Sequence, residues 1–359
     1  MELLLRNREE PALPAGEEGT VRDFIPIQDS ARVLQLWQRV FPAPASGITP
    51  EWEFRNGPLG PQPRAVAEWC GRVVAHAGAV PIRFQYGGDT VLGAYSVAAM
   101  TDAEARGRGL YTGVAKHLYS RLEREGFAFV AGFSNRRSMS VVTGPLGRTP
   151  LRPFPWAICP AASWFPWFRR PGSVGAPVPV DVQANAPLEL EEGVFGDPAL
   201  DDLWRRFSPQ VRIGAIRDAQ FNHWRFTGHP DGVYRMRWGR TAAQIRAYWV
   251  GRIFVFRGIK VAFLVDFLAD PQRLEAGTLL LNDFRQWAAA NGAWLLSALL
   301  PFHSLIRDLL ERFGFLQVPE LFHPHRLCFS VRGLGKVGGE SEIKDPKNWF
   351  LSWADTDIV

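Results

Sequence analysis

The feature that most limits how this chain can fold is an internal repeat. The pattern Trp-x-Phe-x-x-x-Pro-x-Gly begins at Trp52 and again at Trp224. Upstream of each copy, Leu-Trp-x-Arg begins at Leu36 and again at Leu203, so two separate patterns recur at nearly the same spacing. A repeat of this length indicates a duplicated supersecondary unit, and a chain of 359 residues is long enough to bury a core in each copy.

Both halves also have the same order of predicted elements. Alternating apolar residues indicate strands, and a period of three to four indicates helices. Glycines 126 and 292 are expected to end one helix in each half. For the first half this predicts strands at 21–27, 65–69, 73–84, 90–101 and 127–133, with helices at 31–40 and 111–125. For the second half it predicts strands at 234–238, 245–256, 260–268 and 293–300, helices at 271–290 and 302–312, and strands around Phe315 and Leu327.

The order of elements predicts an α+β protein with two tandem domains. The boundary is expected in the stretch rich in Pro and Gly at 166–187, where regular periodicity fails. The predicted division is a tail at 1–19, a first domain at 20–165, a linker at 166–187, a second domain at 188–332, and a linker and tail at 333–359.

Composition excludes several classes of protein. With 47% hydrophobic and 21% charged residues, the chain is too apolar to be disordered. The basic residues that give the net charge of +5 are spread along the chain without a long basic run. Binding of an anionic small ligand accounts for this small excess, and no nucleic-acid partner is predicted. No apolar run is long enough to span a bilayer, and the N-terminus lacks a signal-peptide core.

The three cysteines are far apart in the sequence. Cys70, Cys159 and Cys328 form no Cys-x-x-Cys pair and cannot all be paired within the chain. Neither a disulfide framework nor a metal site is therefore predicted, and a reducing cytoplasm is the expected location.

The most informative segment lies between the predicted strand 90–101 and the helix that follows. It contains Arg106, Gly107, Arg108 and Gly109, and the helix begins near Tyr111. A glycine-rich turn lets backbone N–H groups point into one cavity, and the N-terminus of the helix adds a positive dipole end. This arrangement favours binding of a pyrophosphate, and the two arginines add positive charge at its rim.

This segment resembles the cofactor loop of the GCN5-related N-acetyltransferase (GNAT) superfamily, Arg/Gln-x-x-Gly-x-Gly/Ala. Arg106 and Gly109 match it, whereas Tyr111 stands where the family prefers Gly or Ala. The family's Asn after the next strand, with a small residue three places on, is matched by Asn135 and Ser138. The resemblance implies two tandem GNAT-like domains, each a mixed, mostly antiparallel sheet flanked by helices, with acetyl-CoA as co-substrate. The residues that it assigns to the acetyl-CoA site are Ala99, Met100, Thr101, Arg106, Gly107, Arg108, Gly109, Leu110, Tyr111, Thr112, Asn135 and Ser138.

The second half lacks this loop. No Arg-x-x-Gly-x-Gly pattern lies between Leu268 and Leu279. The segment 309–315, however, resembles the superfamily's Leu-Tyr-x-x-x-Gly-Phe signature. The second domain is therefore expected to be a degenerate GNAT-like copy that has lost its cofactor site.

Catalytic residues are less well defined by the sequence. Where many family members have a Tyr that protonates the departing thiolate, this chain has Val142, so Tyr111 or Tyr95 is a substitute acid. A thiol is also a tolerable leaving group without a dedicated acid. The candidate bases remain open and are Glu53, Glu68, Asp355 and Asp357; the catalytic set predicted is Glu53, Tyr111, Asp355 and Asp357.

These observations predict an N-acetyltransferase that acts on a primary amine of a small molecule. The C-terminal segment 349–355 resembles the ends of tandem acetyltransferase-like proteins of polysaccharide biosynthesis, so an amino sugar is the acceptor suggested by analogy. Two alternatives stay open: a binding protein that retains the fold without turnover, and an aminoacyl transferase of the cell-wall precursor type. The oligomeric state is undetermined.

Overall fold

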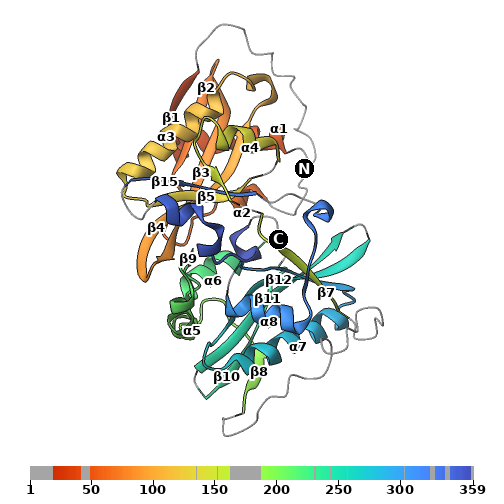
Figure 1. The fold of residues 1–359 in the computed structure, drawn as a ribbon. Helices are drawn as coiled ribbons and strands as arrows, with labels where there is room; N and C mark the ends of the chain where they lie inside the picture. The colour runs from red at the N-terminus through yellow and green to blue at the C-terminus, as the bar shows by residue number, and fades with distance from the viewer. Residues whose placement is uncertain are drawn as a thin grey trace.

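The structure is a computed structural model of the chain. It describes residues 19–41, 49–134, 136–151, 153–161, 187–229, 232–242, 244–256, 258–302, 304–323, 328–335 and 340–356. Two mixed sheets lie one above the other, and helices flank both (Figure 1). Within the described residues, no helix is long and apolar enough to cross a membrane.

The first sheet has the strand order β1-β2-β3-β4-β5-β15-β6, with β9 paired to the end of β3. Most neighbours are antiparallel, but β4 and β5 are parallel and pair only at residues 93–95 and 129–131. The strands of this sheet are β1 (Thr20–Asp23), β2 (Arg64–Trp69), β3 (Arg72–Tyr86), β4 (Asp89–Thr101), β5 (Phe129–Ser134), β6 (Thr149–Pro150), β9 (Ile213–Ala215) and β15 (Cys328–Gly333).

Helices α1 (Pro26–Val40) and α3 (Leu110–Arg124) cover opposite faces of this sheet. Side chains alternate along a strand, so neighbouring residues of β2 point to different layers. Val66 packs with Val33 and Leu36 of α1. On the other face, Ala65 and Ala67 pack with the buried residues of α3. The short helices α2 (Pro50–Glu53) and α4 (Arg136–Thr143) follow α1 and β5.

The second sheet has the order β14-β7-β13-β12-β11-β10-β8. Helices α5 (Ala199–Phe207) and α7 (Leu274–Ala290) pack on its central strands. Its strands are β7 (Trp156–Pro160), β8 (Glu189–Glu192), β10 (Arg235–Thr241), β11 (Gln244–Phe256), β12 (Ile259–Ala269), β13 (Leu295–Leu299) and β14 (Leu316–Gln317). The remaining helices are α6 (Ala219–Phe226), α8 (Leu305–Phe313) and α9 (Glu340–Lys344).

The two sheets exchange strands. β7 follows β6 in the sequence, yet it pairs with β13 of the second sheet, and β15 from the end of the chain pairs with β5 of the first. Figure 1 shows β15 in the upper body and β7 in the lower one. The exchange is reciprocal, because β7 has the same place beside β13 that β15 has beside β5. The domain boundary predicted at 166–187 stays a prediction, because residues 162–186 lie outside the described ranges. Strand pairing crosses this boundary, since β7 pairs in the second sheet and β15 in the first.

Side-chain contacts repeat as well as strand order. The guanidinium Nε of Arg39 lies 2.8 Å from a carboxylate oxygen of Asp102, where β4 ends. In the second copy, Arg206 Nε lies 2.7 Å from a carboxylate oxygen of Asp270, where β12 ends. Both arginines belong to the repeated Leu-Trp-x-Arg pattern. The duplication inferred from sequence is therefore visible as a duplicated ion pair.

Most predicted elements are confirmed with shifted ends, and the first strand differs most. A strand was expected at 21–27, but β1 ends at Asp23 and α1 begins at Pro26. Proline is favoured in the first turn of a helix, where its missing N–H has no partner to lose. The carboxylate of Asp29 also accepts from the backbone N–H of Ile25, at 2.8 Å, and so caps the start of α1.

Candidate active site

The glycine-rich loop between β4 and α3 is open to solvent. Gly107 has φ +79° and Gly109 has φ +74°, a left-handed backbone conformation that glycine adopts at no steric cost. A Cβ added at either position would meet nothing within 4 Å. Among the described residues, no hydrogen bond engages the backbone N–H groups of residues 107–112. The loop and the first turn of α3 therefore present a row of amide donors to solvent.

The charges around this loop suit an anion. Arg106 and Arg108 are exposed, and the Arg108 guanidinium lies 4.2 Å from the ring centroid of Trp69. Asp102, at the start of the loop, is buried and paired with Arg39. Glu104, also in this segment, is exposed, and its carboxylate lies 3.8 Å from a guanidinium nitrogen of Arg72, so both nearby carboxylates have an arginine partner. The amide donors and the two exposed arginines therefore favour an anion at the loop.

The two central strands separate further back along β4, before it reaches this loop. Pairing of β4 with β5 ends at Tyr95 and Ala131. Just beyond, a Cβ at Gly132 would lie 3.3 Å from the carbonyl oxygen of Ser96. Ala99, Met100 and Thr101, which the resemblance assigns to the acetyl-CoA site, follow this point along β4. Ala99 is exposed and Thr101 half-buried, but Met100 is buried against α1.

A bulge lies in β4 at this point. Ala98 has φ +49°, and the register with β3 shifts between His76 and Gly78. The buried His76 ring donates from Nδ1 to the Ala98 carbonyl oxygen at 2.8 Å. Burial lowers the pKa of His76 to about 4, so this imidazole stays neutral near pH 7. The bulge turns backbone amides of β4 out of the sheet ladder.

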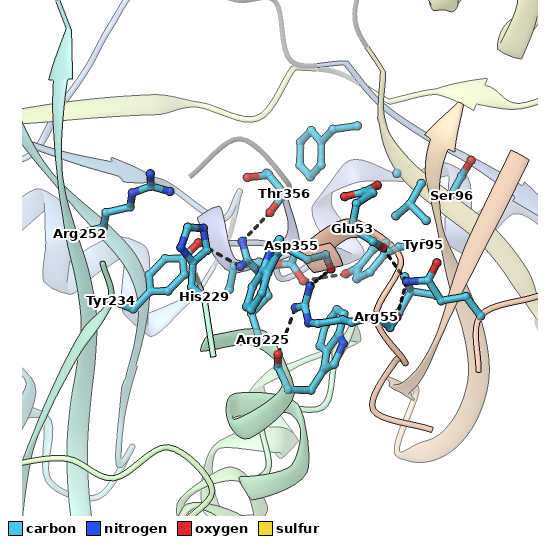
Figure 2. A pocket seen from close by; sticks show the side chains of 18 residues that line it. Glu53, Arg55, Tyr95, Ser96, Arg225, His229, Tyr234, Arg252, Asp355 and Thr356 are labelled. Atoms are coloured by element: carbon cyan, nitrogen blue, oxygen red, sulfur yellow. Dashed lines mark hydrogen bonds between the residues drawn. The ribbon is translucent and has the colours of Figure 1, made fainter. Parts of the chain in front are cut away.

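A cleft of about 790 Å³, measured with the solvent at its mouth, opens where β4 and β5 separate. Figure 2 shows Glu53, Tyr95 and Ser96 on one wall and Tyr234 and Arg252 on the other. The first wall belongs to the first repeat unit and the second wall to the second unit. The full lining comprises Trp52, Glu53, Arg55, Gln62, Val80, Tyr95, Ser96, Val97, Gly132, Phe133, Trp224, Arg225, His229, Tyr234, Arg252, Ala354, Asp355 and Thr356.

The cleft and the glycine loop lie at two points along the same strand. Ser96 and Asp102 are six residues apart, which in an extended strand is about 20 Å. A ligand with a diphosphate at one end and a reactive group at the other, joined by an extended arm, would reach from the loop to the cleft.

The two copies of the Trp-x-Phe repeat meet at the floor of this cleft. The Arg55 guanidinium carbon lies 3.3 Å from the ring centroid of Trp52 and 5.0 Å from that of Trp224. It donates to the carbonyl oxygens of both tryptophans. Burial and the nearby Arg225 lower the pKa of Arg55 to about 10. Glu53 and Arg225 hold equivalent places in the repeat, so the cleft has a carboxylate on one side and a guanidinium on the other.

The C-terminal segment 349–356 closes one side of the cleft. Arg225 donates to the carbonyl oxygens of Ala354 and Thr356 and so fixes this segment. The carboxylate of Asp355 accepts from the Tyr95 hydroxyl at 2.6 Å, from the Ser352 amide at 2.8 Å, and from the fully buried Arg217. Asp355 therefore has a structural anchoring role in the cleft wall.

The other predicted catalytic residues are dispersed. Tyr111 packs half-buried against the core under α3 and does not line the cleft; burial raises its pKa. Burial also raises the pKa of Tyr95 well above its usual value, and the charge of Asp355 adds to this. Glu68 is held by Arg22 and Arg32 on the far side of β2. Of the predicted bases within the described residues, Glu53 and Asp355 line the cleft, and Glu68 does not.

The remaining predicted site residues lie on α3, on α4 or outside the described ranges. Leu110 and Thr112 lie in the first turn of α3, and Ser138 is half-buried in α4. Val142, at the position of the family's usual Tyr, is buried in the core. Asn135 and Asp357 lie outside the described residues.

Sequence reasoning did not single out the cleft residues of the second unit. Arg225, His229, Tyr234 and Arg252 reach the cleft from α6, the loop after it and β11. Of these four, only Arg225 could be located from the sequence, because it stands at the repeat position equivalent to Glu53. The others have no local pattern, because the cleft depends on how the two units pack.

The equivalent region of the second unit is filled. β12 and β13 are parallel and pair only at residues 261–263 and 295–297, so they too diverge. Phe350, Leu351 and Ser352 pack beside this gap and line a small cavity with residues of β12 and β13, and Ser352 donates to Asp266 of β12 at 2.7 Å. The second copy thus has neither the glycine loop nor an open gap.

Comparison with known proteins identifies the first unit. Residues 24–141 match the model of the acetyltransferase (GNAT) domain, and this match includes β4, the glycine loop, α3 and β5. The first unit is a GNAT domain. The match covers the region that sequence patterns assigned to the co-substrate. No sequence among curated proteins matches the chain.

Solved structures share the fold of nearly the whole chain. A probable N-acyltransferase from Enterococcus faecalis has 11% identity and a TM-score of 0.63, covering 89% of this chain and 73% of that one. A GCN5-related N-acetyltransferase from Kribbella flavida has 15% identity and a TM-score of 0.60, covering 88% and 71%. The N-myristoyltransferase of Saccharomyces cerevisiae, solved with myristoyl-CoA, has 12% identity and a TM-score of 0.55, covering 90% and 80%. At these identities the likeness establishes the fold, in which the GNAT domain is followed by a second unit.

Proposed function

We propose that this protein is an acyl-CoA-dependent N-acetyltransferase that moves an acetyl group from acetyl-CoA to a primary amine of a small molecule. The observation that supports this most directly is the open glycine loop of the GNAT domain. Its amides at residues 107–112 have no hydrogen-bond partner among the described residues, and a Cβ at Gly107 or Gly109 would extend into open space. These donors, with Arg106 and Arg108 at the rim, fit a diphosphate.

The co-substrate, when bound, supplies an acetyl group activated as a thioester. The amides of the bulged part of β4, near Ser96 to Ala98, are the donors that would stabilise negative charge on the carbonyl oxygen. Glu53 accepts a proton from the attacking amine, which must be neutral to react. The carbon–nitrogen bond forms as the carbon–sulfur bond breaks, and the departing thiolate is a tolerable leaving group without a dedicated acid. The amino-sugar acceptor remains a prediction from analogy.

The experiment that tests this proposal is calorimetric titration of acetyl-CoA into matched glycine variants. Gly109→Ala adds a methyl group at the N-terminus of α3 and strains a left-handed residue. Gly126→Ala does the same at the other end of this helix, because Gly126 has φ +83° and also has open space around it. Each change costs about 1 kcal/mol of stability. We expect Gly109→Ala to weaken acetyl-CoA binding at least tenfold and Gly126→Ala to leave it near the wild-type value.

Equal binding by both variants, or no binding by the wild-type protein, contradicts the proposal. Release of thiol from acetyl-CoA in the presence of a panel of amines then separates an enzyme from a binding protein. A protein that binds acetyl-CoA tightly and releases no thiol with any amine is the non-catalytic alternative.

A further inference from the structure

The cleft contains a buried arginine, Arg252, whose charge is compensated by none of the residues that the structure describes. Arg252 of β11 is 7% exposed and lines the cleft on the wall opposite Glu53 (Figure 2). Among the described residues, no hydrogen bond or ion pair involves its guanidinium, and its Nε is buried without a partner. A buried cation with unused donors is costly to a folded protein and therefore calls for an explanation.

The other deeply buried arginines show how unusual this is. Arg217 is fully buried and contacts the carboxylates of Asp266 and Asp355. Arg148 donates to two backbone carbonyl oxygens, and Arg225 donates to two carbonyls and the hydroxyl of Tyr234. These three and Arg252 are the described arginines that are more than nine-tenths buried. Of these four, Arg252 alone has no acceptor within the described part of the chain.

Aromatic rings hold Arg252 in place without satisfying its donors. Its guanidinium carbon lies 5.8 Å from the ring centroid of Tyr234 and 5.8 Å from that of Phe254. Contacts at this distance are close to the limit for attraction between a cation and a ring, and a ring contact of this kind supplies no acceptor to the N–H donors of the guanidinium. The rings restrict the side chain and keep its guanidinium beside the cleft.

The fold itself does not require an arginine here. The carbonyl of Val74 accepts from Asp102 N in the first copy, and that of Arg246 accepts from Asp270 N in the second. Val80 lies six residues after Val74 on β3, and Arg252 lies six residues after Arg246 on β11, so the two hold equivalent positions. Both line the cleft. An apolar residue therefore serves at the equivalent position of the first copy.

We propose that Arg252 binds an anionic group, a carboxylate or a phosphate, on the amine that this protein acetylates. The inference rests on the proposed function, and it names the acceptor as an amine that also bears a negative charge. A planar guanidinium donates two parallel hydrogen bonds, one to each of two oxygens of such a group. With the anion at Arg252, the amine would reach toward Glu53 and the bulge of β4 on the opposite wall.

The test compares pairs of amines that differ only in the anion. Lysine and cadaverine differ by a carboxylate, and glucosamine 6-phosphate and glucosamine differ by a phosphate, so the two pairs distinguish the two anions. We expect the wild-type protein to favour the anionic member of at least one pair by about 10- to 100-fold in kcat/KM, mainly through KM. In Arg252→Met this preference should fall to about one.

Stability separates a binding role from a structural one. Arg252→Met removes an unpaired buried charge, so the melting temperature should stay the same or rise. Arg148→Met is the matched control, because it removes a buried arginine that has partners; it should lower the melting temperature and keep the amine preference. A wild-type preference near one for both pairs, or an unchanged preference in Arg252→Met, overturns the inference.

A wrong enzymatic function and a wrong anion site give different experimental results. If no amine is acetylated, that function is wrong, and titration calorimetry with the same four amines decides the role of Arg252. Tighter binding of an anionic member that is lost in Arg252→Met supports the anion site. Equal binding of each pair by the wild-type protein rejects it.

Discussion

The charged residues of the cleft differ in how firmly the protein holds their side chains. The carboxylate of Asp355 is engaged by Arg217, Tyr95 and the amide of Ser352, so its geometry is fixed. Glu53 is half-buried and faces the cleft from the end of the short helix α2. Its equivalent in the second copy, Arg225, fixes the C-terminal segment. The same repeat position thus carries a guanidinium that anchors the C-terminal segment in one copy and a carboxylate that faces the cleft in the other.

A pair of neighbouring carboxylates tests the role of Glu53. Glu51 is exposed in the same helical turn, so Glu51→Gln removes a similar charge without reaching the cleft. We expect Glu53→Gln to lower kcat/KM by about 10²- to 10⁴-fold near pH 7, since general-base catalysis contributes that much. The deficit should shrink at alkaline pH, where solvent deprotonates the amine. Wild-type rates in Glu53→Gln, measured by thiol release, would eliminate it as the base.

Among the elements, the connection after the fourth strand of each unit explains the difference between the copies. Seven residues separate Asp102 from the start of α3 at Leu110, whereas three separate Asp270 from the start of α7 at Leu274. Both aspartates keep the same ion pair with the arginine of the Leu-Trp-x-Arg pattern, Arg39 on α1 and Arg206 on α5. The strand and the helix are therefore retained in both copies, and the shorter connection cannot form a glycine-rich anion site.

The bulge of strand β4 is held by a histidine whose protonation should destabilise the fold. His76 has an unfolded pKa near 6.5 and, because of burial, a folded pKa of about 4. As pH falls below 6.5 the unfolded chain takes up the proton first. The stabilisation is therefore complete above pH 6.5 and is lost as pH falls to about 4, by about 3 kcal/mol.

His76→Asn checks this prediction, because an amide keeps a donor for the Ala98 carbonyl and does not titrate. Urea unfolding between pH 7 and pH 4 should show a smaller loss of unfolding free energy for this variant than for the wild-type protein. Parallel curves for the two proteins would mean that another group causes the acid sensitivity.

At the scale of the whole molecule, strand exchange makes the two units dependent on each other. β15 supplies the neighbour of β5, and β7 supplies the neighbour of β13. One large hydrophobic core includes residues of both sheets and of the C-terminal segment. The cleft exists only where the units meet, so the GNAT domain is complete only in the intact chain.

Separate expression of residues 19–161 and 187–356 tests this dependence. Each half lacks a strand that its sheet needs and exposes an unpaired edge, so we expect neither to unfold cooperatively on heating. The control is the full chain with a protease site introduced at 162–186 and cut after folding; its halves should remain associated on gel filtration. A cooperative thermal transition in either isolated half would show that the exchanged strand is dispensable.

The sequence by itself determined the duplication, the order of most elements and the place of the glycine loop. These depend on local physics: apolar periodicity, the left-handed freedom of Gly107 and Gly109, and a helix that begins directly after them. Only the tertiary structure decided the exchange of β7 and β15, the filling of the second gap, and the meeting of Glu53 and Arg252 across one cleft. The physical reason is that pairing between distant strands and packing between the units leave no local pattern in the residues involved.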